Sequence, residues 1–169
     1  MSGPTSTTGA RPPLKIRRAA DIDAALRKYP TRRSAVMDIL YMVQEDDGWV
    51  SPAAMEEVAE ICHMLPSQVE EMVTFYMMYH RRPVGRHVLA VCGTLPCALC
   101  GAAGLLAYLQ ERLGVGIDEI TPDGLFTIKR VECLGACSEA PLMLVNRTLA
   151  CRLTRQRVDE WIERCRRGT

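Results

Sequence analysis

The chain lacks a strong excess of charge of either sign. Its 169 residues include 21 Lys and Arg against 20 Asp and Glu, for a formal net charge of +1. Proteins that bind nucleic acid through its phosphates usually carry a strongly basic surface. Because the net charge of this chain is close to zero, we expect no nucleic acid partner. The chain also lacks any apolar run approaching the roughly 18 residues of a membrane-spanning helix, so we expect no direct membrane span.

An export signal is also missing from the start of the sequence. Residues 1–13, MSGPTSTTGARPP, are small, polar and rich in proline, with no apolar segment. We predict a flexible tail for these residues and a cytoplasmic location for the protein. Because thiols stay reduced in the cytoplasm, clustered cysteines there bind metal more often than they bind each other.

Histidines are few and scattered. His63, His80 and His87 are the only three, and none pairs with an acidic residue at a spacing suited to acid–base catalysis. We therefore predict no catalytic residues of the ordinary acid–base kind. Any chemistry must rest on the eight cysteines.

Residues 14–82 are predicted to form a helical domain. Apolar residues recur at helical spacing, and a serine followed by proline at 51–52 is a strong helix start. One such face consists of Val36, Ile39, Leu40 and Val43. The stretch FYMMYH at 75–80 is predicted as core, with an interface strip as the alternative.

Residues 83–169 change in character and predict a second domain. Segment 87–92 reads as a buried strand, 101–113 as a helix, 126–131 as a strand, 142–153 as a hairpin, and the residues after Thr154 as a last helix. This β-α-β-β-β-α order, with cysteines at strand ends, is a thioredoxin-like layout. The predicted fold class is therefore α+β, a helical bundle followed by a thioredoxin-like α/β domain.

Two tight cysteine pairs dominate the second domain. Cys92 and Cys97 stand in CGTLPC, and Cys133 and Cys137 stand in CLGAC. Two such pairs, brought together by a fold, provide four thiolates for a soft metal centre. A [2Fe–2S] cluster suits them because each of its two irons takes two cysteines.

Two other metal arrangements remain open from the residues alone. Cys92, Cys97 and Cys100 have the spacing of plant-type ferredoxins, although we favour a buried or semi-buried thiol for Cys100. Structural zinc also accepts four cysteines at these spacings, which would make the chain a zinc-stapled interaction module. The isolated cysteines are predicted to be small buried hydrophobes: Cys62, Cys151 and Cys165.

Several longer segments together resemble a known family. They are GWVS at 48–51, TFYMMY at 74–79, CGTLPCALCGA at 92–102, TPDGLFTI at 121–128 and VECLGACSEAP at 131–141. The resemblance is to the thioredoxin-like [2Fe–2S] subunit of the NADH-dehydrogenase module of respiratory complex I. It covers about residues 20 to 165. Related subunits serve NAD-dependent formate dehydrogenases and electron-bifurcating hydrogenases.

This resemblance implies a cofactor and a function. It implies one [2Fe–2S] cluster with four ligands: Cys92, Cys97, Cys133 and Cys137. The chain would be a one-electron carrier within an NADH-oxidising flavin and iron–sulfur complex. The favoured complex is NADH:quinone oxidoreductase. The alternative is the gamma-type subunit of a formate dehydrogenase or bifurcating hydrogenase.

The resemblance also implies partners. They are a larger iron–sulfur subunit that binds FMN and NADH, and other subunits of a peripheral arm at the cytoplasmic face of the inner membrane. GAAGLL at 101–106 lacks the G-x-G-x-x-G order, so we expect no dinucleotide site in this chain. Cys100 and the segment 147–149 (Arg-Thr-Leu) depart from the family pattern, which leaves the parent complex open.

Overall fold

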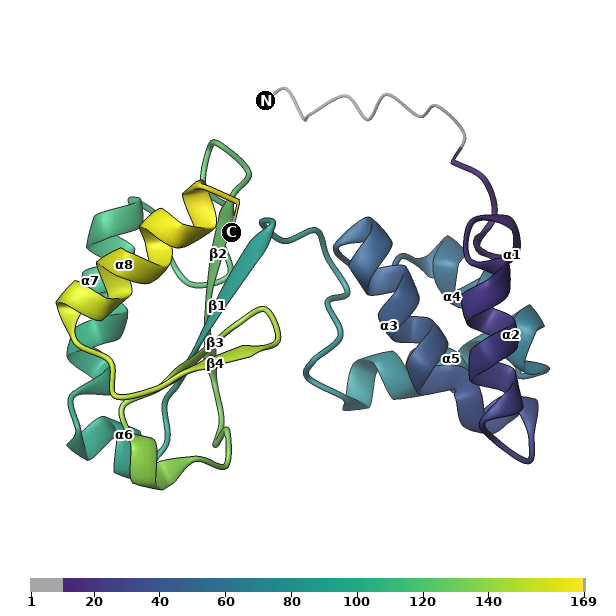
Figure 1. Ribbon diagram of the computed structural model, residues 1–169, viewed down its shortest axis with the longest axis horizontal. Coiled ribbons are helices and arrows are strands. Elements are labelled where there is room, and N and C mark those ends of the chain that lie inside the picture. Colours follow the sequence, from purple (N-terminus) through teal and green to yellow (C-terminus); the bar gives the residue numbers. More distant parts are fainter. Residues whose placement is uncertain (1–10, 169) are drawn as a thin grey trace. The chain divides into compact units, whose positions relative to one another are not determined.

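A computed structural model describes residues 11–168 of the chain (Figure 1). The chain divides between Pro83 and Val84 into two compact units. Each unit has a hydrophobic core of its own. Most of the predicted tail at 1–13 lies outside the described residues, and 11–13 precede the first helix without regular structure.

The first unit is built from helices. They are α1 (Leu14–Arg17), α2 (Ala19–Arg27), the 3-10 helix η1 (Arg32–Ala35), α3 (Val36–Asp47), α4 (Pro52–Cys62) and α5 (Pro66–Phe75). The Ser51 hydroxyl accepts a hydrogen bond from the Ala54 N–H at 3.2 Å, which caps α4 as predicted. The predicted face of α3 is buried at all four positions. None of the described helices is long and apolar enough to cross a membrane.

The stretch FYMMYH at 75–80, which begins at the last residue of α5, was predicted as core. The prediction is wrong for most of these residues. Phe75 is 77% exposed and Met77 is 66% exposed, whereas Tyr79 is 4% exposed. The reason is that α5 ends at Phe75 and the backbone becomes extended at Tyr76, so the helical periodicity stops there. Only Tyr79 turns inward, and its hydroxyl donates to the Met37 carbonyl at 3.1 Å.

The second unit combines a four-stranded sheet with helices. Its elements are β1 (His87–Cys92), α6 (Leu95–Leu99), α7 (Ala102–Leu113), β2 (Phe126–Val131), the 3-10 helix η2 (Cys137–Glu139), β3 (Met143–Val145), β4 (Thr148–Ala150) and α8 (Arg155–Arg166). The strand order is β2-β1-β3-β4, with β1 and β2 parallel and the other neighbours antiparallel. Helices α7 and α8 lie side by side (Figure 1), and Leu109 and Ile162 are fully buried in the core of this unit.

The predicted α+β class and the β-α-β-β-β-α order are confirmed, with one addition. Helix α6 lies between the predicted strand 87–92 and the predicted helix 101–113, where no helix was predicted. Thr94 precedes it, and the Ala98 N–H donates to the Thr94 carbonyl at 2.9 Å. Pro96 lies in the first turn, where its missing N–H costs nothing.

The parallel pairing of β1 and β2 determines where the cysteine segments begin. Cys92 and Val131 are partners in the register, so both strands end at the same edge of the sheet. The ladder is extended by one more bond, from the Gly93 N–H to the Val131 carbonyl at 2.8 Å. The two cysteine-bearing segments therefore leave the sheet next to each other.

Candidate metal centre

The four predicted ligands lie in the second unit as two unlike pairs. Cys92 ends β1 and Cys97 lies within α6; we call them the inner pair, and they are 2% and 1% exposed. Cys133 follows β2 and Cys137 opens η2; we call them the outer pair, and both are exposed. The inner pair belongs to the hydrophobic core of this unit, whereas the outer pair faces solvent.

Hydrogen bonds make Cys92 the more acidic thiol of the inner pair. Burial alone would raise its pKa, but donors offset this: the Thr94 hydroxyl at 3.3 Å from Sγ, the backbone N–H groups of Thr94 and Leu134, and the Cys97 thiol. Together they lower the pKa of Cys92 to about 7. Burial, together with donation to Cys92, raises the pKa of Cys97 to about 11. Thiolate is the form that binds metal, and Cys92 is the member of this pair that loses its proton more readily.

The outer pair has the spacing of two sulfurs on one metal ion. The Sγ atoms of Cys133 and Cys137 are 3.8 Å apart. Two thiolates at about 2.3 Å from one tetrahedral ion are about 3.8 Å apart. The Gly135 N–H donates to the Cys133 sulfur at 3.4 Å. Hydrogen bonding to Cys133 and the charge of that sulfur raise the pKa of Cys137.

The two pairs lie close enough to influence each other. The Leu134 N–H, between the outer cysteines, donates to Cys92 of the inner pair. The charge on Cys137 contributes to the raised pKa of Cys97. Within residues 11–168, no three His, Cys, Asp or Glu side chains form a group suited to a single metal ion. Adjacent thiolate pairs with N–H and O–H donors directed at sulfur fit the requirements of a [2Fe–2S] cluster.

The remaining cysteines take no part in these contacts. Cys100 caps the C-terminus of α6 and is exposed, so the expectation of a buried or semi-buried thiol is wrong. Cys62 and Cys165 are buried as predicted, and burial raises the pKa of Cys62 to about 11. Cys151 is half-buried rather than buried.

Sequence reasoning missed a clamp on the outer pair. Arg152 binds Glu139 twice, with Nε–Oε2 at 2.7 Å and Nη2–Oε1 at 3.0 Å. The Arg152 N–H also donates to the Glu139 carbonyl at 2.8 Å. Because Glu139 ends η2, these bonds attach the segment of Cys137 to the residues after β4. No local sequence signal links two residues that meet only through the hairpin.

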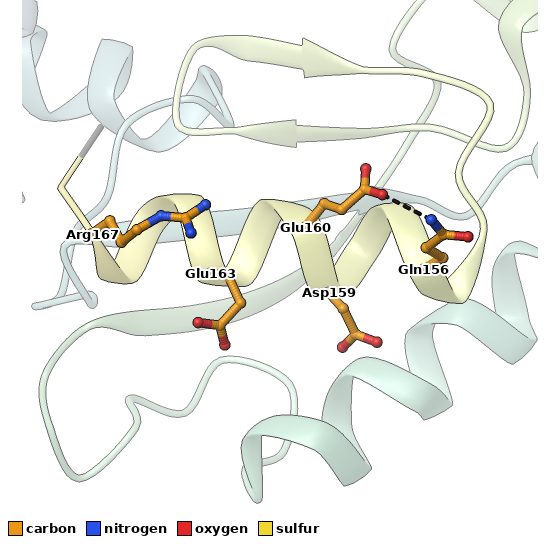
Figure 2. Close-up of a pocket in the computed structure, with 5 residues that line it drawn as sticks. All are labelled: Gln156, Asp159, Glu160, Glu163 and Arg167. Atoms are coloured by element: carbon orange, nitrogen blue, oxygen red, sulfur yellow. Dashed lines mark hydrogen bonds between the residues drawn. The ribbon is translucent and has the colours of Figure 1, made fainter.

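A surface hollow of about 630 Å³ lies along α8 (Figure 2). Its lining consists of Gln156, Asp159, Glu160, Glu163 and Arg167. All five residues come from this one helix, and none of the four predicted ligands lines the hollow. It is therefore separate from the candidate metal centre.

Comparisons with known proteins agree with this geometry. The family model of the thioredoxin-like [2Fe–2S] ferredoxins matches residues 22–166. NADH-quinone oxidoreductase subunit 2 of Thermus thermophilus is 44% identical over 127 residues, which cover 74% of this chain and 70% of that protein. An NADH-quinone oxidoreductase subunit of Rhizobium meliloti is 42% identical over 143 residues, 85% of each chain.

A solved structure shares the fold. An NAD⁺-reducing [NiFe]-hydrogenase in its H2-reduced state superposes with a TM-score of 0.66 at 20% identity. The match covers 78% of this chain and 22% of the hydrogenase chain. The family match spans both units and all four predicted ligand positions. The chain belongs to the thioredoxin-like [2Fe–2S] ferredoxin family.

Proposed function

We propose that this chain is the [2Fe–2S] electron-carrier subunit of an NADH:quinone oxidoreductase. The observation that supports it most directly is the set of two adjacent thiolate pairs, in a chain that is 42% identical to an NADH-quinone oxidoreductase subunit over 85% of both lengths. The proposed ligands are the inner and outer cysteine pairs: Cys92, Cys97, Cys133 and Cys137. A bound cluster of this kind supplies one-electron storage, which the side chains of the protein do not provide.

The residues around the sulfurs have a defined role in this proposal. Core packing keeps water from the inner pair, and backbone N–H groups are directed at sulfurs of both pairs. The donors are Leu134 and Thr94 to Cys92, Leu142 to Cys97 and Gly135 to Cys133. Such donors offset the negative charge of the thiolates and orient them for the metal.

The surface beside the candidate centre suits a protein partner. Leu95 and Leu99 are one helical turn apart on α6, and they are 70% and 79% exposed. Cys97 lies between them and points into the core. Exposed leucines on the helix that carries a proposed ligand favour a covering protein over water. We propose that this partner is a larger flavin subunit that holds FMN and NADH, and that the complex works at the cytoplasmic face of the membrane.

The first test is electron paramagnetic resonance of the anaerobically purified full chain after dithionite reduction. We expect a spin-half signal of about one spin and about two irons per chain. A colourless protein with stoichiometric zinc would instead establish the zinc-stapled module and reject the proposal. Purification of the chain from its native complex tests the partner, because a formate dehydrogenase or a hydrogenase in place of a quinone reductase would reassign the complex.

A further inference from the structure

An arginine side chain lies against the backbone of the inner cysteine loop. A Cβ atom built on Gly93 would lie 2.5 Å from Nε of Arg130, 3.1 Å from its Cγ and 3.3 Å from its Cδ. Since Gly93 directly follows Cys92, the Arg130 stem occupies the space that a side chain would need there. Glycine at 93 is what allows this close approach.

The sheet holds the two residues in this relation. Arg130 is the last but one residue of β2 and pairs with Val91 in the parallel ladder. The Gly93 N–H donates to the carbonyl of Val131, the next residue of β2. The contact is thus set by strand register, at the edge where both cysteine segments begin.

Within residues 11–168, the guanidinium of Arg130 has no ion-pair partner. Arginine remains protonated throughout the working range of pH. Some other arginines of this unit form ion pairs, as Arg112 does with Asp159 and Arg166 does with Glu163. For Arg130, the part of the chain that the structure describes provides no hydrogen bond or ion pair.

We infer that Arg130 raises the reduction potential of the cluster bound by the inner and outer pairs, because its positive charge lies against Gly93, next to Cys92. A cluster with four thiolates is anionic and gains a further negative charge on reduction. A nearby cation therefore stabilises the reduced form more than the oxidised form. This inference rests on the proposed function and concerns how strongly the carrier holds its electron.

The test is a redox titration of the full chain with its cluster, followed by electron paramagnetic resonance. We expect Arg130→Gln to lower the reduction equilibrium constant roughly threefold to tenfold, about 30 to 60 mV at 59 mV per tenfold change. Arg130→Glu should shift the potential further in the same direction. Because the side chain is exposed, the difference from wild type should shrink as salt is added.

Arg166→Gln is the matched control. Arg166 contributes to the electrostatic surroundings of Asp123, which precedes β2 and therefore lies toward the opposite edge of the sheet from the cysteines. The substitution removes the same charge, and we expect the potential to stay at the wild-type value.

Gly93→Ala provides an independent probe. Its Cβ would displace the Arg130 side chain, so we expect a lower potential without any change of net charge. In an Arg130→Ala background the same substitution should have no further effect. A shift of equal size in both backgrounds would show that Gly93 acts through the loop itself.

The outcomes separate this inference from the proposed function. A wild-type chain without a cluster overturns both. A wild-type chain with a full cluster, whose potential moves equally little in Arg130→Gln and Arg166→Gln, overturns only the role of Arg130. A drop in the Arg130 variants that is absent from Arg166→Gln, with an unchanged spectral line shape, supports it.

Discussion

The inner and outer cysteine pairs are held in place by different structural means. The inner pair is part of the hydrophobic core, and its sulfurs receive donors from the Thr94 hydroxyl and from several backbone N–H groups. The outer pair is exposed, and its loop depends on a left-handed Gly135 and on the contact between Glu139 and Arg152. The fold thus determines the position of the inner half of the proposed centre, whereas local contacts of the loop hold the outer half.

The sharpest test of the inner pair compares two cysteines near the same helix. Cys97→Ala removes a buried proposed ligand of α6, and we expect loss of the cluster. Cys100→Ala removes the exposed thiol at the end of that helix, and we expect the cluster to remain. Visible absorption and iron content show whether each of the two variants keeps its cluster. Loss of the cluster in Cys100→Ala would replace one of the proposed ligands.

Removing a hydrogen-bond donor to the inner pair should have a smaller effect than removing a proposed ligand. Thr94→Val keeps the shape of the side chain but removes the hydroxyl that lies 3.3 Å from the Cys92 sulfur. With this donor lost, the added negative charge is less well stabilised, and we expect the potential to fall by roughly 50 mV. Thr94→Ser should restore it. A wild-type potential in the valine variant would show that the backbone donors suffice.

The sequence predicted what local signals determine. The strands His87–Cys92 and Phe126–Val131 have the predicted bounds, because a turn or a cysteine marks their ends. The cysteine pairs could be predicted for the same reason, since each lies within one short segment. Helix α6 was missed because five residues are too few for a periodic pattern, and CGTLPC reads as a loop.

Other features depend on residues that only the fold brings together. The burial of the inner pair comes from core residues of α7, α8 and the sheet, which no local window contains. The contact between Arg130 and Gly93 follows from the register of β1 and β2. Exposure of Phe75 and Met77 follows from the point at which α5 ends, where apolar composition alone predicted core.

A substitution at Gly135 should destabilise the loop that carries the outer pair. Gly135 has φ +79°, and a Cβ there would meet nothing within 4 Å, so conformation rather than crowding disfavours a side chain. We expect Gly135→Ala to cost about 1 to 2 kcal/mol and to speed cluster loss to a chelator. Gly135→Asn is the control, because asparagine tolerates this conformation, and it should lie nearer to wild type. Equal rates for both variants would contradict the conformational explanation.

The clamp on the outer pair should give the smallest effect. Glu139→Gln weakens a bidentate ion pair whose arginine side chain is 69% exposed. Exposed pairs contribute little to stability because water screens them, so we expect cluster loss to a chelator to be at most about fivefold faster. Glu163→Gln, which breaks an exposed pair with Arg166 on α8, is the matched control and should leave the rate unchanged. If both variants lose the cluster at the wild-type rate, the clamp is not needed, and the outer loop holds its cysteines through its own backbone.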